Sequence, residues 1–186
     1  MNALPKQTLT VEEYLRWYLG QPAGRYELVN GTVVAQAPER ARHNRCKAAA
    51  YQVLDRAIAK AKLPCTAFTD GMTVKIDEHT AREPDAAVQC GTKIDPDAII
   101  LDTPLIVVEV VSPPSERDDT GRKLAEYFSV PSILHYLIVD PFRPALIHHR
   151  RQAPDLILTQ IHSSGQINLD PPGLVLDVAD VLNSVA

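Results

Sequence analysis

The segment PLIVVEVVSPP, residues 104–114, constrains the fold of this chain more than any other stretch of its sequence. Its apolar residues are mostly β-branched, which is typical of a strand that is covered on both faces of a sheet. Glu109 interrupts this run near its end. Because a buried carboxylate is costly unless a cation compensates it, Glu109 is the first candidate functional residue.

Length and composition predict one folded unit over residues 1–186, since 45% of the residues are hydrophobic and can bury a substantial core. No window approaches the roughly 18 apolar residues of a membrane span, and the segment MNALPKQTLT lacks the features of a signal peptide. We therefore expect a soluble, cytoplasmic protein with no membrane partner. The cysteines are odd in number and have no CxxC spacing, which predicts buried thiols rather than a disulfide framework or a zinc site: Cys46, Cys65 and Cys90.

The net charge of −4 provides no global attraction to nucleic acid, so any such binding must be local. Basic residues cluster within 40–47, 60–62 and 148–151. For each cluster alone, a solvated surface is a better explanation than a binding groove.

Local patterns predict a mixed sheet with helices packed against it. Thr10 and Glu13 form a capping-box pattern at the start of an amphipathic helix, and Asn30-Gly31 joins two alternating runs into a hairpin. The other expected elements are a long helix at 39–62, strands at 65–69, 72–76, 84–89 and 105–111, a helix at 122–130, a strand at 135–141, a hairpin from 145–150 and 156–161, and a strand leading into a short helix over 174–182.

A second carboxylate accompanies Glu109, because Pro84-Asp85 opens the preceding expected strand. Adjacent strands can bring Asp85 and Glu109 together at one sheet edge, where like charges need a compensating cation. Mg²⁺ suits such a pair, since it prefers one or two carboxylates together with waters and phosphate oxygens. A lysine two residues after Glu109 would assist an attacking water, but Val111 stands there. Lys123, at the start of the next expected helix, is the candidate in its place, with Arg122 as the less favoured substitute.

Several segments, in this order, resemble the Uma-two family of putative restriction endonucleases within the PD-(D/E)xK nuclease superfamily. They lie between about Thr10 and Arg150 and read TVEEYLRWY, YELVNGTVV, REPDAAV, VVEVVSPPSERDDTGRKLAEYF and HYLIVDP. The resemblance implies an α/β fold with a restriction-endonuclease-like mixed β-sheet core flanked by helices, an added β-hairpin near the N-terminus and a β-rich C-terminal tail.

The same resemblance implies a function. The chain would be an endonuclease that uses Mg²⁺ or Mn²⁺, bound by Asp85 and Glu109, with Lys123 as the catalytic cation. Its partner would be nucleic acid, DNA in the first place, and it would act as a homodimer. Glu27 in the hairpin is implied as an additional ligand or a supporting residue, and His43 as a phosphate-binding or proton-shuttling residue.

Other interpretations remain open for each residue and for the chain. Glu109 could form a buried salt bridge with Arg122 or Lys123. The alternatives for the others are a strand-start turn at Asp85, a solvated lysine at 123, a solvent-facing hairpin residue at 27 and a surface histidine at 43. The whole chain could instead be a non-catalytic module that binds nucleic acid or protein, or a hydrolase of another phosphate ester.

Overall fold

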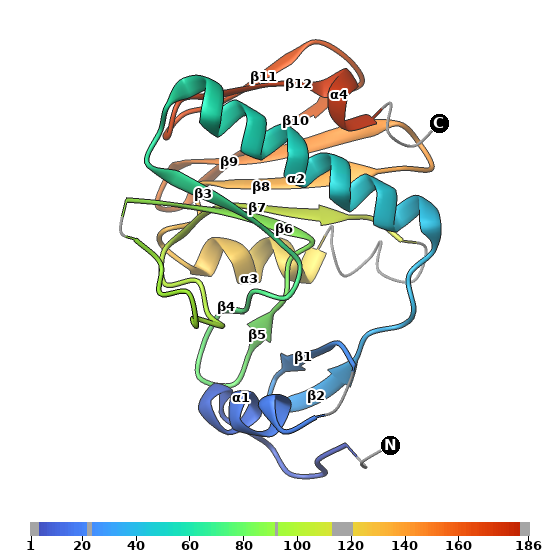
Figure 1. The fold of residues 1–186 in the computed structure, drawn as a ribbon, viewed down its shortest axis with the longest axis vertical. Coiled ribbons are helices and arrows are strands. Elements are labelled where there is room, and N and C mark those ends of the chain that lie inside the picture. The colour runs from blue at the N-terminus through green and yellow to red at the C-terminus, as the bar shows by residue number, and fades with distance from the viewer. Residues whose placement is uncertain (1–3, 22–23, 92, 113–120, 183–186) are drawn as a thin grey trace.

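A six-stranded mixed sheet forms the centre of the molecule in the computed structural model, which describes residues 4–21, 24–91, 93–112 and 121–182 (Figure 1). β7 and β8 are parallel, and the other neighbours in the sheet are antiparallel. The strand order is β10-β9-β8-β7-β6-β3, with the bounds β3 Cys65–Thr69, β6 Ala86–Cys90, β7 Pro104–Val110, β8 His135–Asp140, β9 Ala145–Ala153 and β10 Leu156–His162.

Helices cover the two faces of this sheet. The long helix α2 (Ala41–Ala61) packs on one face together with a C-terminal unit of β11 (Gln166–Leu169), β12 (Leu174–Asp177) and the short helix α4 (Val178–Leu182). The helix α3 (Lys123–Ser129) packs on the other face.

The side chains of β7 alternate between the two faces. Ile106 and Val108 join the core under α2, whereas Val107 joins the core under α3. Because successive side chains of a strand point to opposite sides, Glu109 faces α3, as Val107 does.

A smaller N-terminal layer carries its own core. Its sheet has the order β2-β1-β5-β4, and the helix α1 packs against it. The turn at Asn30-Gly31 has φ angles of 48° and 75°, as a two-residue hairpin turn with two left-handed positions requires. The elements of the layer are α1 Val11–Leu19, β1 Tyr26–Val29, β2 Thr32–Ala35, β4 Val74–Lys75 and β5 Ala81–Arg82.

The predicted mixed sheet flanked by helices is confirmed, including the capping box of α1 and the N-terminal hairpin. The strand expected at 72–76 is shorter, because Val74–Lys75 pairs with β5 in the N-terminal layer and not with the central sheet. In the described part of the chain, no helix combines the length and the apolar character that crossing a membrane would need.

The prediction that all the cysteines are thiols is wrong for two of them. Cys65 and Cys90 form a disulfide, and Cys46 is a buried free cysteine. The antiparallel register of β3 and β6 places Cys65 opposite Cys90 with their Cα atoms 3.9 Å apart. Residue spacing could not reveal this pair, because only the long-range pairing of two strands brings it together.

Candidate active site

Glu109 is buried and is contacted by two residues of α3. The hydroxyl of Tyr127 donates a hydrogen bond of 2.6 Å to Glu109 Oε1, and Lys123 Nζ lies 2.9 Å from the same oxygen. Burial, followed by the charge of Glu109, raises the pKa of Tyr127 well above its ordinary value. Lys123 is only 7% exposed, so the alternative of a solvated lysine is wrong, whereas the alternative of a buried ion pair between Lys123 and Glu109 describes an observed contact.

Asp85 lies at the same end of the sheet as Glu109. Ala86 pairs with Val108, so Asp85 follows the ladder toward the end at which Glu109 lies. Its Oδ2 accepts a 2.8 Å hydrogen bond from the N–H of Val110, which ties it to the backbone directly after Glu109. Burial raises the pKa of Asp85, although nearby positive charge, including that of Lys123, opposes the shift.

His43 reaches the same place from the first turn of α2. Its Nε2 lies 2.8 Å from the carbonyl oxygen of Val110 and 3.4 Å from Asp85 Oδ2. Because a carbonyl oxygen only accepts, Nε2 carries the hydrogen of that bond. The other ring nitrogen, Nδ1, is buried and lies 3.8 Å from Glu39 Oε2. His43 is therefore largely enclosed between two carboxylates rather than a surface residue.

Glu27 is buried in the N-terminal hairpin and contacts the same region from the opposite side. Its Oε2 accepts a 2.9 Å hydrogen bond from Arg82, and its Oε1 lies 3.8 Å from Lys123 Nζ. The solvent-facing alternative for Glu27 is thus wrong. Arg82 is itself only 1% exposed and also donates to Glu126 at 2.7 Å, so it links the N-terminal layer to α3.

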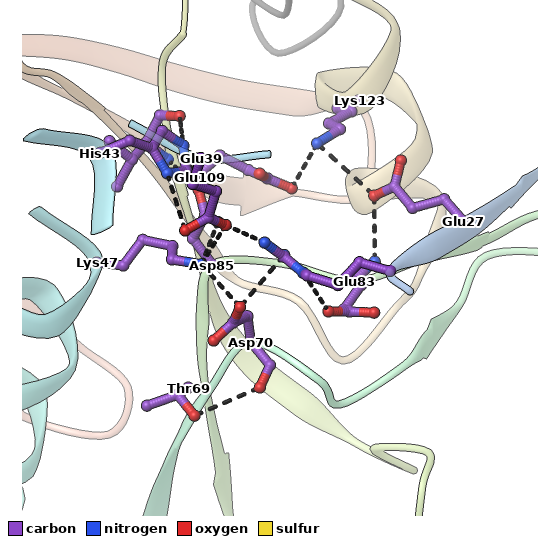
Figure 2. A network of polar contacts seen from close by, with 12 residues as sticks. Glu27, Glu39, His43, Lys47, Thr69, Asp70, Glu83, Asp85, Glu109 and Lys123 are labelled. Atoms are coloured by element: carbon purple, nitrogen blue, oxygen red, sulfur yellow. Dashed lines mark hydrogen bonds and ion pairs between the residues drawn. The ribbon is translucent and has the colours of Figure 1, made fainter. Parts of the chain in front are cut away.

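The sequence analysis missed Glu39 and Lys47, which complete the side of the site formed by α2 (Figure 2). Lys47 Nζ lies 2.5 Å from Glu39, 2.7 Å from Asp70 and 3.8 Å from Asp85. Burial disfavours its charge, but the hydrogen bonds to Asp70 and Glu39 outweigh burial and raise its pKa. The spacing of four residues from Glu39 to His43 to Lys47 is a signal that could have placed all of them on one side of the helix.

The donor set fits a divalent cation. One ligand atom each from Glu39, His43 and Asp85 can be chosen so that all lie within 4.8 Å of one another; Glu109 is not part of this group. Among the described residues, the surrounding ion pairs contain more carboxylates than arginine and lysine side chains: Glu27, Glu39, Asp70, Glu83, Asp85, Glu109 and Glu126 against Arg25, Lys47, Arg82, Arg122 and Lys123. An added cation would relieve the excess of negative charge.

Comparison with known proteins agrees with the fold and the family resemblance. The family model Uma2, described as "Putative restriction endonuclease", matches residues 11–179. An uncharacterised protein from Synechocystis sp. is 24% identical over 188 residues, which cover 98% of this chain and 95% of that protein. A crystal structure of a putative nuclease belonging to DUF820 from Anabaena variabilis matches with a TM-score of 0.74 at 17% identity, covering 96% of this chain and 99% of that one.

The structural match confirms the nuclease-like mixed α/β fold. At 17% identity it is evidence for the fold and not for the function. The family match covers most of the chain and confirms the resemblance that the sequence motifs indicated. The chain belongs to the Uma2 family of putative restriction endonucleases.

Proposed function

We propose that this protein is a divalent-metal-dependent endonuclease that hydrolyses phosphodiester bonds of nucleic acid. The observation that carries the proposal is that Asp85 and Glu109 both lie, buried, at the same end of adjacent strands, with Lys123 Nζ 2.9 Å from Glu109. Family membership supports the reaction class. DNA as the preferred substrate, and a homodimer in which each subunit addresses one strand, are parts of the same proposal.

Asp85 and Glu109 would hold the ion, Mg²⁺ or Mn²⁺, and Glu39 and His43 lie close enough to Asp85 to contribute. When bound, such an ion supplies a more acidic water and neutralises charge on a phosphate oxygen.

The protein residues have separate tasks in this proposal. Lys123 carries its ammonium group to the acidic end of β7, where it stabilises negative charge on the attacking oxygen or on the phosphate. Tyr127 fixes the carboxylate of Glu109 through its hydrogen bond. The burial of these groups lowers the local dielectric constant and so strengthens each of these interactions.

A non-catalytic module that binds nucleic acid or protein is the alternative. That alternative expects Lys123 to turn away from the acids, which its 2.9 Å contact with Glu109 argues against. A structural ion pair would show the same contact, so the cleavage assay distinguishes the two.

A plasmid-nicking assay with Mg²⁺ and with Mn²⁺ tests the proposal. Asp85→Asn and Glu109→Gln should each lower the cleavage rate by about a hundredfold or more, the scale of losing one key electrostatic group. Lys123→Gln should slow cleavage without weakening metal binding in calorimetry. Lys75→Gln, an exposed lysine paired with Glu12 in the N-terminal layer, is the matched control and should cleave normally.

Two results would contradict the proposal. If the Asp85 and Glu109 variants cleave as fast as the wild type, these residues do not form the site. If the wild type binds metal but cleaves no single-stranded, duplex or branched substrate, the protein is a binding module.

A further inference from the structure

An exposed patch beside the candidate site combines an aromatic ring with arginine side chains. Phe142, in the turn between β8 and β9, is 43% exposed. The guanidinium carbon of Arg42 lies 5.2 Å from the centroid of its ring. We use the name Phe142 platform for Phe142 and Arg42 together with their exposed neighbours in the chain, Arg143 in the turn and Arg40 and Arg45 near the start of α2.

Both parts of the Phe142 platform lie at the sheet end that carries the site. β8 runs parallel to β7 with Glu109 opposite Ile138, so the turn after Asp140 emerges one strand away from Glu109. His43, the neighbour of Arg42 in the chain, contacts the carbonyl of Val110 at this end. Figure 1 shows the first turns of α2 and the β8–β9 turn on the side toward which the arrow of β7 points.

The arginines of the Phe142 platform at the start of α2 do not stabilise this helix. α1 begins with a capping box and two glutamates in its first turn, as the helix dipole favours. α2 begins without a side-chain cap and without an acidic residue in its first turn, and it carries Arg40, Arg42 and Arg45 at or near its start, all exposed. Cations near the start of a helix reduce its stability, so these arginines fit a surface that binds an anion better than a stabilising role.

The carboxylate of Asp140 is the acidic group nearest to Phe142 in the chain. It accepts a 2.9 Å hydrogen bond from Nε of Arg143, whose side chain remains 70% exposed. A surface that combines arginine side chains with an exposed aromatic ring matches a nucleic-acid strand, because phosphates bind the guanidinium groups and an unpaired base stacks on the ring.

We propose that the Phe142 platform is where a single-stranded segment of the substrate binds before it enters the site, an inference that rests on the proposed nuclease function. A base stacks on the ring of Phe142, beside the guanidinium of Arg42. The flanking phosphates contact Arg40, Arg45 and Arg143. The overall charge of −4 gives no general attraction to nucleic acid, so this local patch supplies it.

Fluorescence anisotropy of a labelled single-stranded oligonucleotide, in EDTA so that no cleavage occurs, tests the proposal. Phe142→Ala should weaken binding about tenfold, and Phe142→Trp should restore it. Arg40→Gln with Arg45→Gln should flatten the slope of log affinity against log salt by about 0.7 for each lost phosphate contact. The matched control is Arg56→Gln with Lys60→Gln, which removes the same charge from exposed positions further along α2 and should leave binding unchanged.

Three results would contradict the inference. The wild type does not bind the oligonucleotide, or both the Phe142→Ala variant and the arginine variant bind it as tightly as the wild type does. The third is that the control pair loses as much affinity as the arginine pair. The outcome also separates this inference from the proposed function. If binding depends on the platform residues but the wild type cleaves nothing, the proposed nuclease function is rejected and the binding inference stands. Cleavage that depends on Asp85, with KM unchanged in Phe142→Ala, keeps the nuclease and rejects the platform.

Discussion

Glu109 is acceptable in a buried strand because two donors compensate its charge at a single oxygen. The ammonium of Lys123 and the hydroxyl of Tyr127 both contact Oε1, and both residues lie on the same side of α3 because they are four positions apart. In the proposed mechanism, the bond to Tyr127 would keep the carboxylate of Glu109 in place while the ammonium of Lys123 shifts toward the substrate.

The replacement Tyr127→Phe tests this arrangement. Removing the hydroxyl leaves Glu109 with one hydrogen-bond donor fewer in a buried place, which should cost about 1 to 3 kcal/mol of folding free energy. The position of the carboxylate should also become less fixed, so kcat should fall about tenfold, with a smaller change in KM. Urea denaturation and the nicking assay measure the two effects. Tyr51→Phe, on the α2 side of the sheet, is the control; equal effects in both variants would mean that the Tyr127 hydroxyl has no special role.

At the scale of elements, Arg82 connects parts of the chain that are far apart in sequence. It lies in β5 and donates to Glu27 of β1 at 2.9 Å and to Glu126 of α3 at 2.7 Å. Desolvation opposes its charge, but the two carboxylates outweigh desolvation and raise its pKa above its ordinary value. The N-terminal layer and α3 are therefore joined through one buried guanidinium group.

Arg82→Met should destabilise the protein by about 3 to 5 kcal/mol, because it removes the buried guanidinium that two largely buried carboxylates share and leaves each only a more distant cation. Adding Glu27→Gln and Glu126→Gln to the same chain should recover part of that loss, since the uncompensated charges are then gone. Urea denaturation of the single and triple variants measures both changes. A single variant within about 0.5 kcal/mol of the wild type, the range of ordinary surface substitutions, would show that the bridge is not structural.

Elements that depend on local patterns could be predicted from the sequence, and contacts that depend on long-range pairing could not. The capping box of α1, the Asn30-Gly31 turn and the apolar run of β7 each determine their structure within a few residues. β5 and the disulfide depend on the partner that each segment meets in a sheet.

The candidate site divides in the same way. Asp85 and Glu109 could be singled out from short patterns, an acid after Pro84 and an acid in an apolar strand, and Lys123 from its place at the start of the next helix, since Val111 stands where a lysine was expected. Lys47 lies in α2 and Glu39 directly before its N-cap. Their spacing of four from His43 places them on one side, but nothing in the sequence indicates that this side meets the end of β7, so their role had to be found in the structure.

On the scale of the whole molecule, the pairing of two buried histidines predicts how stability responds to acid. His135 in β8 and His148 in β9 are almost fully buried, and their Nδ1 and Nε2 atoms lie 2.9 Å apart. His135 Nε2 donates to the carbonyl of Pro171 at 2.8 Å, so its Nδ1 must accept from His148. His135 is therefore neutral in the fold, since its one ring hydrogen points to Pro171. Burial, above all, lowers the pKa of His135 to about 4 and that of His148 to about 3.

The sign of the pH effect follows from these values. The ordinary histidine pKa is 6.5, so below that pH these two histidines bind protons in the unfolded chain but stay unprotonated in the folded one. The contribution of the two neutral histidines to folding stability is fully present above about pH 7 and is lost as the pH falls from 6.5 toward 4. These two groups together should lower the free energy of unfolding by up to about 2.7 kcal/mol per pH unit in that interval, and His149, whose pKa burial also lowers, should add to the slope in the same direction.

Urea denaturation between pH 8 and pH 4 measures this slope, and His148→Gln isolates its cause. The glutamine amide can still donate to His135 Nδ1, so stability at pH 8 should change little while the slope falls by the share of one proton, up to about 1.4 kcal/mol per pH unit. His79→Gln, in the N-terminal layer, should keep the full slope. Equal slopes in all three proteins would mean that other groups govern the response to acid. His135 lies at the start of β8, opposite the end that meets the candidate site, so this loss of stability should be separable from any pH dependence of cleavage.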